Sequence, residues 1–278
     1  MNKLCVIGDP VLHSKSPLIQ NTMLRTLGLD YEYGCQAVKR DELPLWLERV
    51  RTENWSGFNA TMPHKEALVP YMDELDEDAK LYGAVNTVCH RNGKLYGFNT
   101  DGGGFARALA MNNIPIRGTR FVLLGSGGAA KAVALKLAQQ GAGKIVICNR
   151  TVEKAAALAS HAPEIMTASG FSPAELAEAC ADCDVLINCT NLGMVGSPSF
   201  EELDFVDALP SGAPVCDLIY HPLKTELLAR AEAQGHPIMN GLPLLLHQAI
   251  LALEHFTQTE IDAAAMLPPV EAALAQAL

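Results

Sequence analysis

The sequence has little positive charge and few aromatic residues. Of its 278 residues, 21 are Lys or Arg and 31 are Asp or Glu, so the formal net charge is -10, and aromatic residues make up 6%. A protein that general charge holds to nucleic acid needs a basic face to neutralise phosphates. We therefore expect no nucleic-acid partner. Any anionic ligand must be bound locally, by a few basic side chains and backbone N–H groups.

Long apolar runs are also missing. The apolar run near the N-terminus is short and ends at Asp9, unlike a secretory signal. Residues 242–256 form the most apolar stretch, but they include Glu254 and are fewer than the ~20 residues that cross a bilayer. This stretch predicts a buried helix, and we expect no membrane partner.

The eight cysteines show neither a disulfide framework nor a metal site. They are scattered through apolar runs, which is typical of reduced, buried thiols in a cytoplasmic protein. Cys180 and Cys183 have C-x-x-C spacing, but no second pair and no pair of histidines completes a zinc set. We expect a cytoplasmic protein without a metal ion.

Short β-branched runs alternate with longer helical patterns along the chain, and apolar residues amount to 49%. This alternation predicts an α/β protein with mostly parallel strands. In the first part of the chain the expected strands are 4–7, 31–38 and 57–62, the expected helices are 17–27 and 43–50, and Asn92-Gly93 joins a hairpin of residues 87–90 and 94–98.

A second unit begins at about Gly118. Its expected strands are 120–124, 144–148, 184–189 and 214–219, and its expected helices are 131–140, 153–160 and 226–233. This order predicts a doubly wound, Rossmann-type domain. The Ala-rich chain after Gly241 is expected to be helical and to pack back on the first domain. We therefore predict one domain of residues 1–101 plus 241–278 and an inserted domain of residues 102–240.

Residues 125–130 fit the G-x-G-x-x-A variant of the dinucleotide-binding fingerprint. Gly125 permits a tight turn, Gly127 lets the backbone approach a pyrophosphate, and the small Ala130 lets the helix pack on the strand. The expected helix that follows offers free N–H groups and a positive dipole to phosphates. The sequence therefore predicts a dinucleotide cofactor in the inserted domain.

The end of the next strand favours NADP over NAD. An NAD-binding unit usually carries an acidic residue about 20 residues after the fingerprint, bonded to the ribose 2′-OH. Here that position holds Asn149, Arg150 and Thr151, with no acid. Arg150 can pair bidentately with a 2′-phosphate, and Thr151 can donate its hydroxyl. The alternative is that Arg150 is a solvated loop residue.

Polar clusters stand at four places in the first domain: residues 13–17, 57–65, 83–87 and 97–101. Ser14 and Ser16 precede an expected helix, so they can either hold a carboxylate or cap the helix. The Asn and Thr residues can bind the hydroxyls of a small polyol, while Lys65 and Asp101 can move a proton.

These clusters, in this order, resemble the shikimate dehydrogenase family. The resemblance runs from Gly8 to Gln248 and also includes the fingerprint, residues 149–151, 217–222 and 241–248. It implies a substrate domain and an NADP domain, and the interconversion of shikimate and 3-dehydroshikimate with NADP(H) on the route to chorismate and aromatic amino acids. It also allows a homodimer.

The resemblance assigns a role to each matching residue. Lys65 and Asp101 would be the catalytic couple. The substrate would be bound by Ser14, Ser16, Asn59, Thr61, Asn86, Tyr220 and Gln248, with Asp101 also in contact. The cofactor would be bound by Glu77, Gly125, Ser126, Gly127, Gly128, Ala129, Asn149, Arg150, Thr151, Thr190, Met194, Leu218 and Gly241.

The chain also departs from the family pattern. The family often has His at Gln20 and Val at Ala60. It often has Gly at Pro243 and Met at Leu244, near the nicotinamide, which leaves the shape of the hydride-transfer pocket open.

Two roles remain open for Lys65. A lysine in water is mostly protonated at neutral pH, so Lys65 is either a general acid/base or a donor that orients the substrate alcohol.

Two other functions of the protein also remain open. One is a quinate/shikimate dehydrogenase or a paralogue that uses NAD or an amino-polyol acid. The other is a non-catalytic NADP-binding sensor. The presence of both Lys65 and Asp101 argues against a sensor. A serine hydrolase is excluded because Gly-x-Ser-x-Gly is absent.

Overall fold

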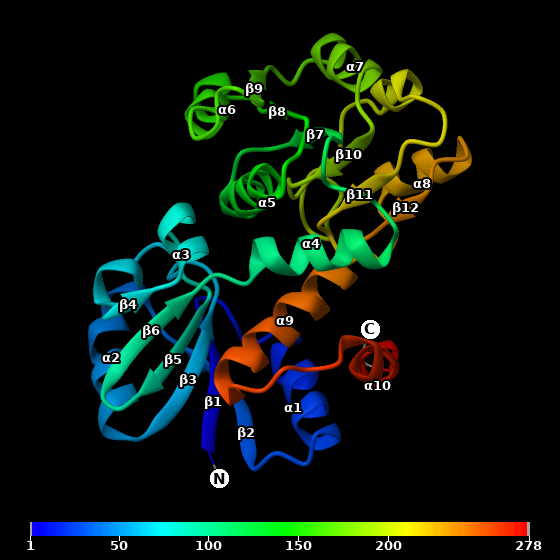
Figure 1. The fold of residues 1–278 in the computed structure, drawn as a ribbon. Helices are drawn as coiled ribbons and strands as arrows, with labels where there is room; N and C mark the ends of the chain where they lie inside the picture. The colour runs from blue at the N-terminus through cyan, green and yellow to red at the C-terminus, as the bar shows by residue number, and fades with distance from the viewer. Residues whose placement is uncertain (1, 277–278) are drawn as a thin grey trace. The chain divides into compact units, whose positions relative to one another are not determined.

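The computed structural model describes residues 2–276 and has an α/β fold, as predicted. The chain divides into two compact units (Figure 1). Unit 1 consists of residues 1–103 and 246–278, and unit 2 consists of residues 104–245. None of the described helices is long and apolar enough to cross a membrane.

Unit 1 is built on a mixed sheet of six strands in the order β2-β1-β3-β5-β6-β4. Strand β1 pairs in parallel with β2 and β3, whereas β5 is antiparallel to both β3 and β6. The strands are β1 Asn2–Gly8, β2 Tyr31–Ala37, β3 Trp55–Ala60, β4 Glu74–Leu75, β5 Thr87–Arg91 and β6 Lys94–Phe98.

The predicted hairpin of β5 and β6 is confirmed. Asn92 and Gly93 both have positive φ, 50° and 77°, as a type I′ turn requires. The hairpin makes β5 start, and β6 end, at the sheet edge where β3 ends. Polar residues that flank these strands therefore meet at one edge.

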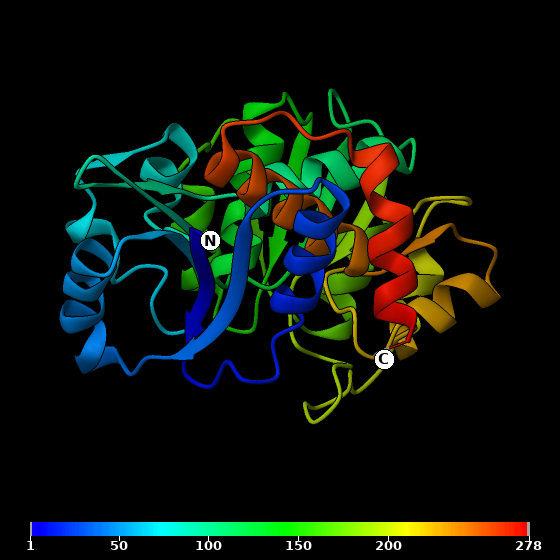
Figure 2. The ribbon, with the colours of Figure 1, turned by 90° about the horizontal axis from the view of Figure 1, so that it is seen from below.

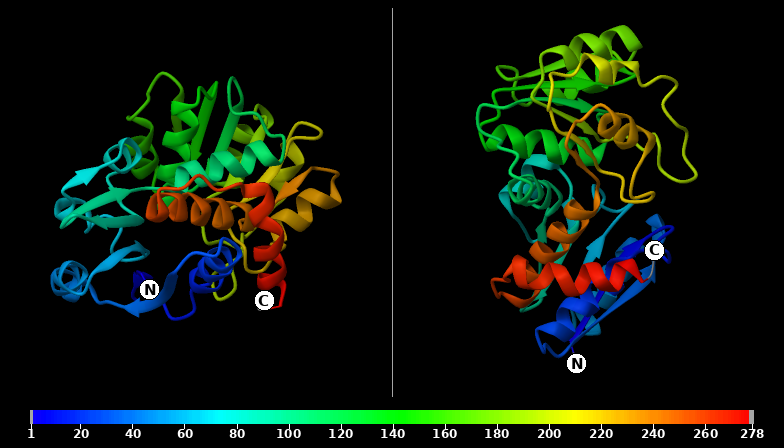
Figure 3. Two further views of the ribbon diagram at one scale, coloured as in Figure 1. Left: turned by 60° about the horizontal axis from the view of Figure 1, so that its bottom comes forward. Right: turned by 90° about the vertical axis from the view of Figure 1, so that its right-hand side faces the viewer.

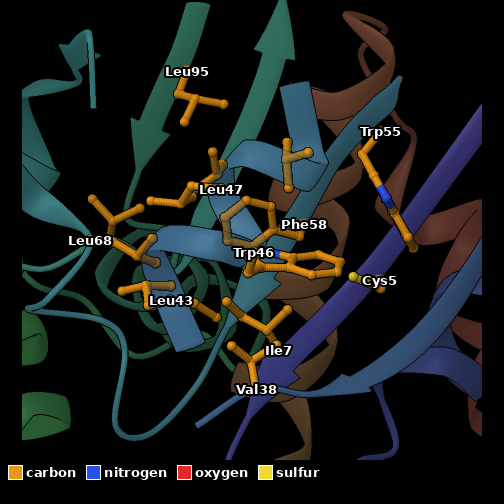
Figure 4. Close-up of a cluster of buried hydrophobic side chains, with 14 of the residues drawn as sticks. Cys5, Ile7, Val38, Leu43, Trp46, Leu47, Trp55, Phe58, Leu68 and Leu95 are labelled. Atoms are coloured by element: carbon orange, nitrogen blue, oxygen red, sulfur yellow. The ribbon is translucent and has the colours of Figure 1, made fainter. Parts of the chain in front are cut away.

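Helices cover both faces of this sheet. On one face, α2 (Leu43–Thr52) buries Leu43, Trp46 and Leu47 against Ile7 and Phe58 of the strands (Figure 4). The Trp46 ring lies edge-on to Phe58 at a centroid distance of 6.0 Å. Burying side chains of this size stabilises the fold by about 1.5–3 kcal/mol each.

On the other face, α1 (Ser16–Thr26) packs against β1 and β2 and buries Ile19, Met23 and Leu24. The C-terminal helix α10 (Ala263–Ala275) packs against α1, so opposite ends of the chain lie side by side (Figures 2 and 3). Helix α9 (Leu242–Thr257) contributes Phe256, whose ring lies against Gly57 of β3. The return of the C-terminal helices to the first unit agrees with the prediction.

Unit 2 is built on six parallel strands in the order β9-β8-β7-β10-β11-β12. Numbered within the unit, this order is 3-2-1-4-5-6, the order of dinucleotide-binding domains. The strands are β7 Arg120–Leu124, β8 Lys144–Cys148, β9 Met166–Ser169, β10 Val185–Asn188, β11 Val215–Asp217 and β12 Ile238–Met239. The doubly wound domain is therefore confirmed.

Helices again cover this sheet. One face is covered by α7 (Pro173–Ala181), α8 (Glu226–Ala233) and the 3-10 helix Asp204–Ala208. The other α-helices of this unit are α5 Gly128–Gln139 and α6 Val152–Ala159, while α4 Asp101–Met111 begins in unit 1 and continues into unit 2. Unit 1 also contains α3 Glu77–Tyr82 and the 3-10 helices Arg40–Glu42 and Val69–Tyr71. The helix that the sequence predicts over residues 131–140 is α5, which begins three residues earlier, at Gly128. It starts directly after the fingerprint turn, with Gly127 as its N-cap.

Candidate active site and cofactor site

The candidate catalytic residues lie at one edge of the unit 1 sheet. Lys65 follows β3, Asn86 precedes β5, and Asp101 follows β6 and begins α4. Because β5 is antiparallel to β3 and β6, the ends of these strands meet at this edge. The topology therefore brings together residues that are up to 36 positions apart in the sequence.

Lys65 and Asp101 form an ion pair, with Lys65 Nζ 2.6 Å from Asp101 Oδ2. The Lys65 side chain is 34% exposed and that of Asp101 is 20% exposed, so a ligand can reach both. The second oxygen of Asp101, Oδ1, accepts a hydrogen bond of 2.8 Å from Asn86 Nδ2. Asp101 is thus held on both oxygens, and the ammonium of Lys65 remains partly open to solvent.

Asn59 and Asn86 connect this pair to the interior. Asn59 Nδ2 donates to the backbone carbonyl of Asn86 at 3.1 Å and to Thr87 Oγ1 at 2.9 Å. Asn59 Oδ1 accepts from the phenol of Tyr33 at 2.7 Å. The sequence indicates polar clusters at residues 83–87 and 97–101, but it assigns no role to Tyr33 or Thr87. A tyrosine within a strand pattern carries no signal of its hydrogen-bond partner.

The serine turn lies between β1 and α1. The N-cap of α1 is Lys15, without a side-chain capping bond, so neither serine caps the helix at that position. The Ser14 Oγ instead accepts a bond of 3.2 Å from the backbone N–H of Ser16. Both serines are partly exposed. Thr61 lies close by, because a Cβ on Gly8 at the end of β1 would collide with its methyl group.

Two further side chains near this edge are structural. Gln20, where the family often has His, is fully buried and donates a bond of 3.0 Å from Nε2 to the carbonyl of Ala249 in α9. It therefore ties α1 to α9. His64 is also fully buried, and its Nε2 lies 2.7 Å from the carbonyl of Val38, which anchors the loop that carries Lys65. Next to Lys65, the sequence favours a histidine at the surface or one that supports the site from behind; the burial of His64 rules out the surface position.

The fingerprint turn lies at the carboxyl edge of the unit 2 sheet. Gly125 has φ of 103°, a value that favours glycine, and its N–H donates to the carbonyl of Cys148 at 2.7 Å. Gly127 and Gly128 are exposed, and a Cβ on either would meet nothing within 4 Å. The start of α5 therefore offers open backbone N–H groups to an anion, a geometry that fits a dinucleotide pyrophosphate.

The end of β8 carries the group expected to select the cofactor. Arg150 and Thr151 are both exposed, and Asn149 Nδ2 donates to the carbonyl of Thr151 at 2.8 Å. Thr151 is the N-cap of α6, but its hydroxyl makes no capping bond. A guanidinium and a hydroxyl thus stand together, and they fit a 2′-phosphate.

A buried carboxylate organises the ends of β10 and β11. Asp217 is fully buried and accepts bonds from Asn188 Nδ2 at 3.1 Å, from the Ile219 N–H at 2.9 Å and from Thr225 Oγ1 at 2.7 Å. Burial raises the pKa of Asp217, while these three hydrogen bonds act in the opposite direction. Asn188 Oδ1 in turn accepts from both the N–H and the hydroxyl of Thr190.

The remaining predicted cofactor residues follow the strands of the same sheet, apart from Glu77. Leu218 follows β11, and Gly241 follows β12, with its N–H donating to the carbonyl of Ile219 at 2.9 Å. A Cβ on Gly241 would collide with the Leu218 carbonyl, so only glycine fits there. Met194 is exposed in the loop after β10. Glu77 is exposed at the start of α3, in unit 1.

The predicted residues thus form two sets. Ser14, Ser16, Asn59, Thr61, Lys65, Glu77, Asn86, Asp101 and Gln248 belong to unit 1. Tyr220 and the predicted cofactor residues other than Glu77 belong to unit 2. Burial raises the pKa of Tyr220. In unit 1 the structure joins Asn59, Asn86, Lys65 and Asp101 by direct hydrogen bonds. Gln248 lies in α9.

The chain matches two family models. Residues 6–88 match the shikimate dehydrogenase substrate binding domain, and residues 108–195 match shikimate / quinate 5-dehydrogenase. A relative from Alkaliphilus metalliredigens named shikimate dehydrogenase (NADP(+)) is 41% identical over 257 residues, which cover 91% of this chain and 90% of that protein.

Solved structures show the same fold. A shikimate 5-dehydrogenase from Thermus thermophilus in complex with NADP(H) and shikimate is 34% identical, with a TM-score of 0.85 over 98% of this chain and 100% of that one. A 5-ketofructose reductase of Gluconobacter is 31% identical, with a TM-score of 0.86 over 97% and 98%. The identity, coverage and domain matches together show that this chain belongs to the shikimate dehydrogenase family.

Proposed function

We propose that this protein catalyses the reversible NADPH-dependent reduction of 3-dehydroshikimate to shikimate. The observation that carries the proposal is the partly exposed ion pair of Lys65 and Asp101 at a sheet edge that also presents serine, threonine and asparagine side chains. A secondary alcohol that is oxidised must lose a proton as well as a hydride. This couple can take that proton, and the surrounding groups can bind the other hydroxyls.

Lys65 and Asp101 handle the proton. In the oxidation of shikimate, Lys65 Nζ lies against the reacting oxygen, and the hydroxyl proton passes to the couple of Lys65 and Asp101. In the reduction the couple returns a proton to the carbonyl oxygen. The bound nicotinamide supplies the hydride chemistry. Asp101 keeps Lys65 in place through the 2.6 Å contact, and general acid–base catalysis of this kind contributes about 10²–10⁴-fold.

The other proposed residues bind and orient. Ser14 and Ser16 offer hydroxyls to the substrate carboxylate, with Tyr220 as a further contact. Thr61, Asn86 and Gln248 bind the ring hydroxyls. Gly127 and Gly128 leave room for the pyrophosphate at the start of α5, while Arg150 and Thr151 bind the 2′-phosphate that distinguishes NADP from NAD.

The test is the appearance of NADPH at 340 nm when the purified protein is mixed with shikimate and NADP+. We expect turnover with shikimate, a strong preference for NADP+ over NAD+, and slower turnover of quinate. The similarity to the Gluconobacter 5-ketofructose reductase makes 5-ketofructose a necessary member of the substrate panel. No change in absorbance with shikimate over a broad pH range would overturn the proposal, and faster reduction of 5-ketofructose would reassign the substrate.

Compartment and assembly are part of the proposal. The eight cysteines all lie in the described chain and are free thiols, six of them buried, which suits the reducing cytoplasm. We propose a cytoplasmic enzyme that can form a homodimer. Light scattering after gel filtration measures the mass against the 29.8 kDa of one chain.

A further inference from the structure

The carboxylate of Asp101 is the last member of a chain of hydrogen bonds that begins at Tyr33. Tyr33 donates to Asn59 Oδ1 at 2.7 Å, and Asn59 Nδ2 donates to Thr87 Oγ1 at 2.9 Å. Thr87 Oγ1 donates to Asn86 Oδ1 at 2.9 Å, and Asn86 Nδ2 donates to Asp101 Oδ1 at 2.8 Å. The chain crosses the sheet from the edge strand β2 through β3 to the starts of β5 and α4.

Two backbone groups fix the direction of every bond in this chain. The Asn86 carbonyl can only accept, so Asn59 must turn Nδ2 toward it and Oδ1 toward Tyr33. The Thr100 N–H can only donate, and it lies 2.9 Å from Asn86 Oδ1, so Asn86 must turn Nδ2 toward Asp101. Asn86 Oδ1 can only accept, so the hydroxyl of Thr87 donates to it and accepts from Asn59 Nδ2.

The inner members of the chain are buried, so water has little access to replace these bonds. Tyr33 is 2% exposed, Thr87 is fully buried, and Asn59 is 9% exposed. Both hydrogens of Asn59 Nδ2 are donated inside the protein, so its amide has no hydrogen left for a ligand. Removing the hydroxyl of Tyr33 or Thr87 takes one partner from the buried Asn59 amide, and a shift of Asn59 reaches Asn86 because Asn59 also donates to the Asn86 carbonyl.

We infer that Tyr33, Asn59 and Thr87 are positioning residues that act through Asn86 to hold Asp101 in the orientation that pairs with Lys65. This inference rests on the proposed function, because it assigns these residues to the same proton-transfer couple. It gives Asn59 a defined role inside the protein, where both of its amide hydrogens are donated. It also assigns a role to Tyr33, whose strand lies at the far edge of the sheet from β6.

Steady-state kinetics of isosteric variants test the inference. Tyr33→Phe and Thr87→Val each remove a hydroxyl and keep the side-chain shape. We expect each to lower kcat for shikimate oxidation about three- to tenfold, with the KM for NADP+ unchanged within twofold. Thr87→Ser keeps the hydroxyl and is expected to restore kcat to near the wild-type value. Tyr31→Phe removes a hydroxyl from the same strand outside the chain of bonds and should leave kcat unchanged.

A double-mutant cycle separates positioning from a general structural effect. If Tyr33 acts through Asp101, then Tyr33→Phe should cost almost nothing further in an Asp101→Asn background. Equal losses in both backgrounds, or equal losses in Thr87→Ser and Thr87→Val, would show a structural role instead. Unchanged kcat in both Tyr33→Phe and Thr87→Val would also overturn the inference.

A measurement that does not depend on turnover tests the inference separately from the proposed function. In a protein labelled with ¹⁵N-asparagine, the side-chain amide protons of Asn59 and Asn86 should exchange slowly with solvent. The exchange should be at least tenfold faster in Thr87→Val but not in Thr87→Ser. If the wild type fails to oxidise shikimate, the proposed function fails, and this exchange pattern still decides whether the chain of bonds holds Asn86.

Discussion

At the scale of single residues, we expect a few basic side chains to bind the anionic ligands, because the net charge of the whole chain does not attract anions. The chain carries a net charge of -10, yet the proposed substrate and cofactor are both anions. We therefore expect their binding to depend on Lys65, on Arg150 and on polar groups such as the hydroxyls of Ser14 and Ser16. Replacing one of these basic side chains should affect one step of the reaction rather than the whole protein.

Lys65→Ala should lower kcat by at least ~10²-fold, with a smaller change in KM for shikimate. In the proposed mechanism Lys65 acts on the reacting oxygen, where charge develops in the transition state. Steady-state assays at 340 nm provide both constants. Lys144→Ala, at the start of β8, is the control and should behave as the wild type. A large rise in KM at near-normal kcat would show that Lys65 only binds substrate.

Arg150→Ala should lower kcat/KM for NADP+ about 10- to 100-fold, which corresponds to the loss of a charge-assisted bond of about 1.5–3 kcal/mol. The value for NAD+ should not change, because NAD+ has no 2′-phosphate, so NAD+ is the internal control. An unchanged preference for NADP+ would remove Arg150 from the cofactor site.

At the scale of helices and strands, the sequence predicts elements well where local signals agree. The strands Arg120–Leu124 and Lys144–Cys148 and the helix Glu226–Ala233 have the predicted bounds, because a turn or a cap stands at each end. Helix α4 is not predicted, since its first turn contains Gly102, Gly103 and Gly104, which are poor helix formers.

In the candidate site, too, features with a local signal can be predicted and features without one cannot. Its residue types can be predicted from the sequence, as can their positions at strand ends, because the hairpin signal at Asn92-Gly93 and the parallel strands of the inserted domain are both visible there. The partners of Tyr33, Thr87 and Asp217 cannot, since each bond joins side chains on different strands and depends on the three-dimensional register.

Two glycines should affect different properties when replaced by alanine: Gly241 the stability of the fold, and Gly127 the binding of the cofactor. Gly241→Ala should lower the free energy of unfolding by roughly 1–3 kcal/mol, because its Cβ would collide with the Leu218 carbonyl. Gly127 has φ of -73°, which any residue can adopt, so Gly127→Ala should leave stability nearly unchanged. It should instead raise the KM for NADP+ about tenfold, because its Cβ occupies the space beside the pyrophosphate. Urea unfolding and cofactor titration measure the two effects, and the reverse pattern would contradict both assignments.

The pairing of β7 with β10 should depend on pH. Arg120 donates from its backbone N–H and from its guanidinium to Asp184, each at 2.8 Å, and this keeps the pKa of Asp184 below its usual 3.8. A lowered folded-state pKa stabilises the fold above pH 3.8, and the stabilisation is lost as the pH falls through the lower folded value. Because both side chains are partly exposed, the contribution is at most about 1 kcal/mol.

Asp184→Asn should therefore reduce the free energy of unfolding by about 0.5–1 kcal/mol at pH 7 and by much less at pH values below the folded pKa. Urea denaturation at a series of pH values measures the difference. Asp204→Asn is the control, since the Asp204 side chain is 83% exposed and lies 4.0 Å from Arg230. A difference between wild type and Asp184→Asn that stays constant with pH would show that the ion pair is not its source.

At the scale of the whole molecule, unit 2 is a continuous segment and unit 1 is not. Unit 2 has its own buried core, which extends from Val122 to Ala231, and roughly 140 residues, a normal domain size. Residues 104–245 expressed alone should therefore unfold cooperatively and bind to immobilised 2′,5′-ADP. The same fragment with Arg150→Ala is the control and should fold but not bind. A fragment without a cooperative transition would show that unit 2 depends on unit 1.

The pairing of α1 with α10 has a consequence for the chain during synthesis. Residues 104–245 leave the ribosome before residue 246, so the unit that begins second is the first to be complete. At 5–20 residues per second, α1 waits roughly 10–50 s for α10, the helix that packs against it in the finished unit. The interval before the last two helices emerge is thus when the nascent protein is most exposed to aggregation, and its first residues are the ones at risk.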